Sequence, residues 1–591
     1  MKWSEFKVGK KYDYDYIENL IETDCIHDIT DPELLRVIIS KCTKEEFNII
    51  KKLDLSGVCF DGISVKGFDF TGSKGVKINP QTVLDKDLSS TTLSGVEIIG
   101  SFDGVYIYYT NFTGNKGAKI NPQTVRDRIL ANTTLSGVEI IGSFDGVYVE
   151  GTDFTGCKGV KINPQTVRGR ILVNTELSGV EIIGSFDGVD VRRTDFTGSK
   201  GAKIDPQTVG CESLYDTKLS GVEIIGSLDG VDVRGTDFTG SKGAKIDPQT
   251  VGYKRLVGYK RLNGTKLSGV EIIGSFDDVD IECTDFTGSK GAKINPQTVR
   301  YKSLQKTTLS GAEIIGSFDN VCIHGTDFTG SIGAKIDPQT VCRGFAHTKL
   351  SGVEIIGSFD DVGIQCTDFT GSKGAKINPQ TVWKKYLCNV KLSGVEIIGS
   401  FDGVVIFGID FTGSKGAKIN PQTVGCKSLE NTKLSGVEII GSLDGVDVRE
   451  TDFTESKGVK INPQTVKYKT LNNAKLSGVE IIGSFDGVSI YGTNFTGSKG
   501  AKIDPQTVLN KCLKNTTLSG VEIIGSLDGV DIRLTDFTGS LFAKMELRKV
   551  KYEVLKQIIL NEIETNSSNL EKIKILKKID DSFKKDKNKK I

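Results

Sequence analysis

The sequence has few of the residues and patterns on which catalytic and metal sites are usually built. Its three histidines, His27, His324 and His347, have no matching nucleophile nearby in the sequence. Its 12 cysteines are scattered over unrelated positions without a CxxC pair, which indicates neither a zinc site nor a disulfide framework. We therefore expect no catalytic residues, no metal site and no cofactor, and interpret the chain as a protein that is not an enzyme.

Long apolar runs and an excess of charge of one sign are missing as well. The sequence has no run of 18 apolar residues, so it predicts no membrane-spanning helix. Its first 20 residues lack the apolar core of a secretory signal. Scattered cysteines are typical of a reducing compartment, and we predict a cytoplasmic protein. The net charge is only +1.

The sequence has instead a unit of 42 residues that repeats about twelve times. The segment LSGVEIIG begins at Leu93, and its leucine recurs at 135, 177, 219, 267, 309, 350, 392, 434, 476 and 518, with a degenerate first copy at Leu55. A unit of this length cannot bury its own apolar face and must stack on its neighbours. We therefore expect a solenoid over residues 53–540, with residues 1–52 and 541–591 as separate ends.

Within one period the apolar residues lie about five positions apart. In residues 86–127 they are Leu88, Leu93, Ile98, Phe102, Ile107, Phe112, Ile120 and Val125. A helix has a period near 3.6 and an alternating strand a period of 2, so neither explains this spacing. A coil with four short sides does explain it, because each side then turns its central residue inward. The eight segments of a period make two such coils.

The charged residues support two coils per period. The residue before each Ile98-type centre alternates between Glu and Lys, as in Glu97, Lys119, Glu139 and Lys161, and continues to Glu522. If a period is two coils, these residues stack on one another about 4.8 Å apart. Opposite charges on stacked neighbours contribute about 0.2–1 kcal/mol each.

Segments such as TDFTG, VDVRG and TKLSG resemble the pentapeptide-repeat family. The resemblance implies an all-β fold, a right-handed quadrilateral parallel β-helix whose small residue and Leu or Phe point inward. Three features depart from the family pattern. Lys86, Arg128 and Lys302 stand where a small inward residue belongs, the tripeptide SKG is extra, and a proline falls in every period.

The proline leaves two alternatives for residues 80–88 and their repeats. They can form a side of the β-helix like the others. Alternatively, Asn79 caps a short helical turn with Pro80 at its first position. In the second case the basic residues at 86, 128 and 302 are solvated.

The two ends predict short α-helical caps. Asp31-Pro32 and the capping box Thr43-x-x-Glu46 are helix-start signals, so residues 1–52 are expected to be a mostly helical cap. Residues 541–591 are expected to be a helical segment with a basic tail. These C-terminal helices could join two copies in a homodimer.

We interpret the chain as a non-catalytic structural or interaction protein, a rod-like repeat scaffold that binds an unidentified partner, expected to be a protein. Asp103, Asp145 and Asp187 recur in every period, which indicates an architectural and not a catalytic role. The resemblance implies one alternative, a DNA-mimicking modulator of DNA gyrase, a topoisomerase. The ends carry charges of −2 and +6, so the array carries only −3. Duplex DNA carries about one negative charge per 1.7 Å, and this difference disfavours the alternative.

One side of the coil is the candidate partner-binding side. Three sides are nearly identical from repeat to repeat, whereas the side with the Ile107-type and Leu88-type segments varies. Tyr and Arg are the residues most enriched at binding hot spots. The alternative is that this side only tolerates drift after recent duplication. Its outward positions include Tyr106, Tyr108, Tyr148, Arg192, Arg234, His324, Phe407, Arg449, Tyr491 and Arg533.

Overall fold

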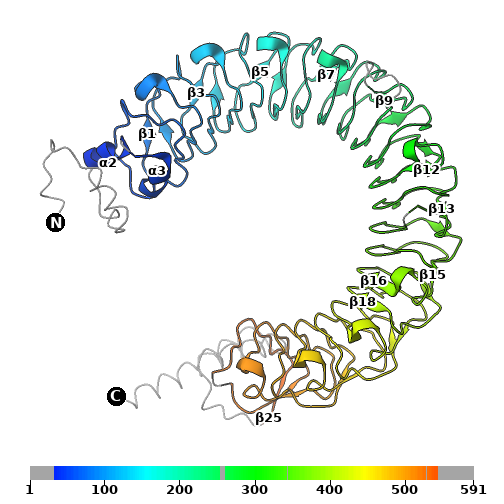
Figure 1. Cartoon of the computed structure of the whole chain (residues 1–591). Coiled ribbons are helices and arrows are strands. Elements are labelled where there is room, and N and C mark those ends of the chain that lie inside the picture. Colours follow the sequence, from blue (N-terminus) through cyan, green and yellow to red (C-terminus); the bar gives the residue numbers. More distant parts are fainter. Residues whose placement is uncertain (1–31, 41, 253–259, 343, 528, 544–591) are drawn as a thin grey trace, which may run out of the picture. The chain divides into compact units, whose positions relative to one another are not determined.

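A computed structural model describes residues 32–543, apart from 41, 253–259, 343 and 528 (Figure 1). The described chain divides into two compact units near residue 300. Unit 1 extends to Ile294 and includes Thr298–Tyr301, and unit 2 comprises Asn295–Gln297 and the chain from Lys302 onward. The two units are described separately below.

Each unit is a parallel β-solenoid, and together they contain about 22 turns. The strands are two or three residues long, and the described pairs are parallel. The predicted all-β solenoid is therefore confirmed, with helix as a minor addition. In unit 1 the strands are β1 (Lys77–Ile78), β2 (Glu97–Ile98), β3 (Lys119–Ile120), β4 (Glu139–Ile140), β5 (Lys161–Ile162), β6 (Glu181–Ile182), β7 (Lys203–Ile204), β8 (Glu223–Ile224), β9 (Lys245–Ile246), β10 (Glu271–Ile272) and β11 (Lys293–Ile294). In unit 2 they are β12 (Glu313–Ile314), β13 (Lys335–Ile336), β14 (Glu354–Ile355), β15 (Lys376–Ile377), β16 (Tyr386–Cys388), β17 (Glu396–Ile397), β18 (Val405–Phe407), β19 (Lys418–Ile419), β20 (Glu438–Ile439), β21 (Lys460–Ile461), β22 (Glu480–Ile481), β23 (Lys502–Ile503), β24 (Glu522–Ile524) and β25 (Leu541–Ala543).

The strand register confirms two coils per period. Lys119 lies opposite Glu139 in the pair of β3 and β4, and their side chains form an ion pair of 3.0 Å. Lys203 and Glu223 repeat this arrangement at 2.9 Å. The same ion pair recurs along both units, from Lys77–Glu97 at 3.1 Å onward. The alternation of Glu and Lys therefore marks stacked positions.

The extra tripeptide of each period is a bulge that changes the pairing partner. Lys116, in the tripeptide, lies opposite Glu97 of the preceding coil, whereas Lys119 lies opposite Glu139 of the following coil. This side of the coil therefore pairs with the preceding coil through Lys116 and with the following coil through Lys119. Such a shift is expected where extra residues enter a ladder of paired strands. The ion pair joins Lys119 to Glu139 of the following coil.

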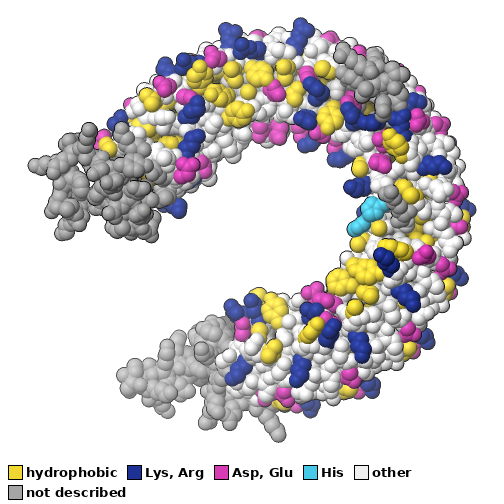
Figure 2. Space-filling view, in the orientation of Figure 1, with side chains coloured by type: hydrophobic (Ala, Val, Ile, Leu, Met, Phe, Trp, Pro, Cys, Tyr) yellow, Lys and Arg dark blue, Asp and Glu magenta, His cyan; other side chains and the backbone are white. Residues whose placement is uncertain are grey.

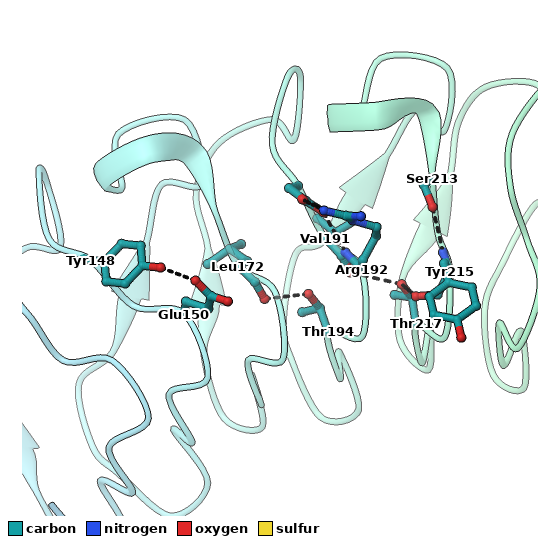
Figure 3. A network of polar contacts seen from close by, with 10 residues as sticks. Tyr148, Glu150, Leu172, Val191, Arg192, Thr194, Ser213, Tyr215 and Thr217 are labelled. Atoms are coloured by element: carbon teal, nitrogen blue, oxygen red, sulfur yellow. Dashed lines mark hydrogen bonds and ion pairs between the residues drawn. The ribbon is translucent and has the colours of Figure 1, made fainter. Parts of the chain in front are cut away.

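The interior of the solenoid is built from the centres of the segments. The rings of Phe102 and Phe112 are buried and meet edge to face, with centroids 5.4 Å apart. The small inward residue of many segments is a buried threonine. The Thr194 hydroxyl donates a hydrogen bond of 2.7 Å to the Leu172 carbonyl of the coil before it, as Figure 3 shows. Buried threonine hydroxyl groups such as this one are thereby satisfied by the backbone of the neighbouring coil. Buried serine hydroxyl groups such as those of Ser199 and Ser241 have no hydrogen-bond partner within the described residues.

Residues 80–88 contain turns, as the helical alternative predicted, and are not a plain side of the β-helix. Residues 80–82 form a turn that Asn79 caps, because its Oδ1 accepts a hydrogen bond of 3.0 Å from the Gln81 amide and its carbonyl accepts one of 3.1 Å from the Thr82 amide. Val83 is then extended (φ −61°, ψ 152°), and a separate 3-10 turn, η3 (Leu84–Lys86), follows it. Its central residue has a φ of 57°, which stops the turn from continuing as a helix. The basic residues at 86, 128 and 302 are exposed, as the helical alternative required. Equivalent turns are η4 (Arg126–Arg128), η5 (Arg168–Arg170), η6 (Gly210–Glu212), η7 (Arg300–Lys302), η8 (Trp383–Lys385), η9 (Gly425–Lys427), η10 (Lys467–Lys469) and η11 (Leu509–Lys511).

Two short helices precede the first coil. They are α2 (Pro32–Ile39) and α3 (Lys44–Ile50), and the first bridge of the solenoid follows at residue 54. Phe47 of α3 is buried and stacks on Phe68 with centroids 4.3 Å apart. The expected C-terminal helices and homodimer lie outside the described residues, and the domain limits at 52 and 540 stay predictions. Within the described ranges, no helix is long and apolar enough to cross a membrane.

A second column of stacked side chains is less regular than the Lys–Glu column. Lys218 lies between Asp195 and Asp237 and forms an ion pair of 2.7 Å with Asp195. One period earlier the same position holds Glu176, between Asp153 and Asp195. Burial and these two carboxylates raise the pKa of Glu176 above its usual value. Three acids in succession are therefore a local defect of the solenoid.

We expect Glu176→Lys to stabilise unit 1 by about 0.5–1 kcal/mol at pH 7, the range of an exposed ion pair. Because the pKa of Glu176 is raised in the folded state, its charge destabilises the fold above that pKa and the penalty disappears as the pH falls through it. The advantage of the variant should therefore shrink in acid and in high salt, measured by chemical denaturation. Lys218→Glu should lose a similar amount, and unchanged stability in both variants would contradict the stacking.

Candidate interaction surface

The variable side consists of the Leu88-type and Ile107-type segments, whose outward residues differ between coils. The central residue of each segment is buried, and its neighbours lie at or near the surface in most coils, as with Asp190, Val191 and Arg192. Some neighbours, such as Ser89 and Asp232, are buried. The ten predicted residues divide equally between the two units. Unit 1 carries Tyr106, Tyr108, Tyr148, Arg192 and Arg234, and unit 2 carries His324, Phe407, Arg449, Tyr491 and Arg533.

Tyrosines form a cluster in the early coils of unit 1. The ring of Tyr108 lies 6.0 Å from that of Tyr106 and 6.0 Å from that of Tyr109, edge to face in both cases. Tyr109 is not among the residues predicted from the sequence, because it is not a direct neighbour of a buried centre. Tyr109 has a φ of 59° and is 58% exposed. Half of the periods have glycine there, so an aromatic residue in a position that often holds glycine was the available signal.

Tyr148 lies next to this cluster but is held by its own coil. Its hydroxyl donates a hydrogen bond to the Glu150 carboxylate, as Figure 3 shows. That bond is the main cause that raises the pKa of Tyr148, followed by burial and by the charges of Glu150 and Tyr109. Its side chain is thus fixed in place before any partner binds.

Basic side chains flank the tyrosines. The Arg126 guanidinium lies 4.4 Å from the centroid of the Tyr106 ring, a cation–π contact. Arg128 and Arg168 line a groove of about 730 Å³. Ile129, also in that groove, is the bridge partner of Tyr148. Hydrophobic and basic side chains lie next to one another over this part of unit 1 (Figure 2).

Each of the four predicted arginines is hydrogen-bonded to an aspartate of its own segment. Arg234 donates to both carboxylate oxygens of Asp232, at 2.8 Å from Nε and 2.6 Å from Nη2. The same fork joins Arg192, Arg449 and Arg533 to the aspartate two residues earlier. Arg533 lowers the pKa of Asp531 to about 2. The sequence signal was the Asp-x-Arg spacing, which places both side chains on one face of a strand.

The predicted residues of unit 2 lie near further aromatic side chains. The rings of His324 and His347 meet edge to face at 5.4 Å. Phe407 of β18 is partly exposed and lies opposite Cys388 of β16. Trp383 is 42% exposed and is not among the residues predicted from the sequence. Figure 2 shows hydrophobic side chains gathered beside the histidine in this region.

The aspartates that recur in every period are tied into the backbone turns. Asp187 accepts hydrogen bonds from the hydroxyl groups of Ser185 and Thr208, and these bonds lower its pKa. Asp402 is held in the same way by Ser400 and Thr423. Their architectural role is consistent with the expectation from the sequence. Within the described residues, no group of three or more His, Cys, Asp or Glu side chains could hold a metal ion.

Comparison with known proteins adds little to this geometry. No family model and no curated protein matches the chain. A similar solved structure is HetL, a pentapeptide repeat protein involved in heterocyst differentiation regulation from the cyanobacterium Nostoc sp. strain PCC 7120, with 13% identity and a TM-score of 0.09 over 64% of this chain and 91% of that one. Another is QnrB1, a plasmid-mediated fluoroquinolone resistance protein, with 16% identity and a TM-score of 0.10 over 41% of this chain and 90% of that one. These values carry no argument about function. HetL belongs to the family that the sequence resembles.

Proposed function

We propose that this chain is a non-catalytic scaffold that binds a protein partner through the tyrosine cluster of unit 1, defined as Tyr106, Tyr108 and Tyr109, with Tyr148 beside it. The observation that carries the proposal is the contrast on the variable side. Outward arginines elsewhere on that side are bound to aspartates of their own strands, whereas the tyrosines pack on one another beside a basic groove.

The cluster has the properties of a binding anchor. Tyrosine offers a large contact area with few rotatable bonds, so little entropy is lost when it is immobilised. Packing among Tyr106, Tyr108 and Tyr109 further reduces this loss, because the rings are held before binding. The adjacent guanidinium of Arg126 and the groove with Arg128 favour a partner with acidic groups at the rim of its interface.

The invariant sides are poorer candidates for a specific site. They carry one exposed isoleucine per period, such as Ile99, Ile141 and Ile183, each 58–59% exposed. Because this surface is the same in every period, it offers many equal positions to a partner. A partner that binds at one place needs a surface that occurs once, and the tyrosine cluster occurs once.

The gyrase alternative gains no support from the described residues. A mimic of duplex DNA needs rows of negative charge. The acids of the invariant side are instead paired with lysines, as in Lys161–Glu181 at 3.0 Å. A cytoplasmic location remains part of the proposal.

A comparison of three variants tests the proposed site. Proteins of the source cell are captured on the immobilised chain, purified, and titrated against each variant. Loss of two or more hot-spot tyrosines should weaken binding by at least about 30-fold, the equivalent of 2 kcal/mol. We expect this loss of affinity for the variant that combines Tyr106→Ala, Tyr108→Ala and Tyr148→Ala.

Two controls make the result specific. The triple variant Ile99→Ala, Ile141→Ala and Ile183→Ala changes exposed side chains of the invariant side and should bind as the wild type does. Arg192→Ala combined with Arg234→Ala removes arginines that aspartates already hold and should weaken binding less than threefold. The proposal is wrong if the tyrosine variant, folded by circular dichroism, retains full affinity.

A further inference from the structure

Two neighbouring 3-10 turns of unit 1 each carry a pair of arginines. The turn η4 contains Arg126 and Arg128, and η5 contains Arg168 and Arg170. The turns on either side, η3 with the sequence LDK and η6 with the sequence GCE, contain no arginine. Because η4 and η5 are one period or two coils apart, about 10 Å separates them. The four arginines therefore form a local basic patch.

The segment from Gly146 to Tyr148 is the floor of a groove between these turns. The Tyr148 amide donates a hydrogen bond to the Arg128 carbonyl, and the Arg168 amide donates one to the Val147 carbonyl, both at 2.9 Å. Arg128 and Arg168 thus flank one segment from opposite sides and line a groove of about 730 Å³. A Cβ atom at position 146 would lie 3.4 Å from Nη1 of Arg128, so glycine leaves the space beside this guanidinium open.

The groove over Gly146 has a guanidinium on each side, whereas its neighbour has one. Nη1 of Arg168 donates to the Asp127 carbonyl at 3.0 Å, which fixes the guanidinium and leaves its other N–H groups for water or a ligand. The next groove lies over Gly188. It has Arg170 on one side, with Nη1 3.3 Å from a Cβ atom placed at position 188, and Gly210 on the other.

A later period of unit 1 shows how a groove of this kind holds an anion. Asp278 occupies the position of Gly146, and Arg300 occupies the position of Arg168. Arg300 donates from Nε and Nη2 to the two carboxylate oxygens of Asp278, at 3.2 Å each. An oxyanion over Gly146 would therefore meet the fork of Arg168 in the same way, and it would meet Arg128 from the other side.

The charges around the groove favour a doubly charged anion. The four arginines of the two turns are accompanied by Asp127 and by Asp145, whose carboxylate is held by the Ser143 hydroxyl at 3.0 Å. Four arginines against two aspartates leave a net charge of +2. A phosphomonoester carries a charge of about −1.5 to −2 and three acceptor oxygens, so two guanidinium forks can bind it together. A carboxylate has two oxygens, which one fork satisfies, as at Asp278.

We propose that Arg128 and Arg168 bind a phosphomonoester group of the protein partner, seated over Gly146. The inference rests on the proposed function, because this groove adjoins the tyrosine cluster that holds the same partner. Arg126 of η4 joins the two sites, since its guanidinium lies on the ring of Tyr106. The phosphate group would add charge-assisted hydrogen bonds to the contacts of the tyrosines, so that phosphorylation of the partner controls its affinity.

A nucleic acid fits this surface less well. Its backbone phosphates are diesters with one negative charge each, and a single strand binds by stacking its bases on free aromatic faces. Here Arg126 already covers a face of Tyr106 at 4.4 Å. The rings of Tyr108 and its two neighbours meet edge to face and offer no common stacking surface.

Fluorescence anisotropy with labelled peptides and the full-length chain tests the proposal without the partner. The probes are peptide libraries with random flanks whose central residue is phosphoserine, phosphotyrosine, glutamate or serine. Inorganic phosphate and a short oligothymidylate strand are titrated in the same buffer. We expect at least one phosphorylated library to bind saturably and at least tenfold more tightly than the glutamate and serine libraries, as for hydrogen bonds between charged groups.

Two variants change the groove, and each has a matched control one period along. Arg128→Lys combined with Arg168→Lys keeps the charge but removes both forks and should weaken phosphopeptide binding about tenfold. Gly146→Asp introduces the residue of position 278, where the φ is 56°, and should abolish binding. The controls Arg170→Lys and Gly188→Asp make the same changes outside the groove, and each should alter the affinity less than threefold.

The captured partner separates this inference from the proposed function. Phosphatase treatment of the partner should weaken its binding to the chain at least tenfold. If the tyrosine variant loses the partner but phosphatase treatment and the two Arg→Lys changes have no effect, the phosphate site is wrong and the proposed function stands. If phosphatase and Gly146→Asp weaken binding but the tyrosine variant does not, the phosphate site stands and the tyrosine cluster is not the binding site.

Four results with the probes would overturn the proposal. The first is that no phosphorylated library binds more tightly than the glutamate library. The second is an equal loss in Gly188→Asp and Gly146→Asp, which would mean that only the overall charge matters. The third is inorganic phosphate binding as tightly as the phosphopeptides, which would assign the groove to a free anion. The fourth is tighter binding of oligothymidylate that Gly146→Asp removes, which would assign it to a nucleic acid.

Discussion

Replacing Phe154 with alanine should lower the local stability of unit 1 by about 3–5 kcal/mol, the range for removing a buried phenylalanine. Phe154 is fully buried, and its ring meets that of Phe144 edge to face at 5.2 Å. The substitution removes this contact and leaves a cavity that the neighbouring coils cannot close, because each coil is fixed by hydrogen bonds to the coils on both sides. The Phe154 amide, for example, donates to the Glu176 carbonyl at 2.9 Å.

Amide hydrogen exchange is the suitable measurement, since long repeat arrays do not unfold in a single two-state transition. Protection should fall in the coils around residues 130–180 and much less in distant coils. Ile141→Ala is the matched control, because this side chain is 59% exposed in the same period and its loss should change stability by less than about 0.5 kcal/mol. Equal effects of the two variants would contradict the assignment of inward and outward residues.

The glycine that ends the three-residue bulge of each period should not tolerate a side chain. Gly243 has a φ of +78°, and a Cβ atom there would lie 2.7 Å from the Ile224 carbonyl oxygen. Gly104 has a similar φ of +68° but no atom within 4 Å of its Cβ position. Gly243→Asn should therefore lose about 1–3 kcal/mol more than Gly104→Asn, because only the first introduces a clash in addition to the positive φ.

Asparagine is the appropriate substitute because Asn320 occupies the position of Gly104 in another period, with a φ of 57°. Each variant is compared with the wild type by hydrogen exchange of the coils next to the substitution. A loss of equal size in both variants would mean that the close carbonyl is not what selects glycine at the bulge.

The solenoid and its register could be predicted from the sequence because they depend on local spacing. Apolar residues five apart define a four-sided coil, and the alternation of Glu and Lys fixes which segments stack. The bulge could not be located in this way. Lys116 and Lys119 carry the same charge, so the pattern does not say which of them lies opposite a given glutamate.

The candidate site was harder to predict, for a different reason. Whether an outward side chain is available depends on what it contacts, and composition alone does not say. Arg234 and Tyr108 are both outward residues of the variable side, yet Arg234 is held by Asp232 and Tyr108 packs on other tyrosines.

The central claim is that a protein partner binds the tyrosine cluster of unit 1 and not the invariant side. Side-chain oxidation by hydroxyl radicals, quantified by mass spectrometry with and without the captured partner, tests it most directly. We predict protection of Tyr106, Tyr108 and Tyr109, while Ile99 and Ile141 are oxidised to the same extent in both samples. Protection of the isoleucines with unchanged oxidation of the tyrosines would contradict it.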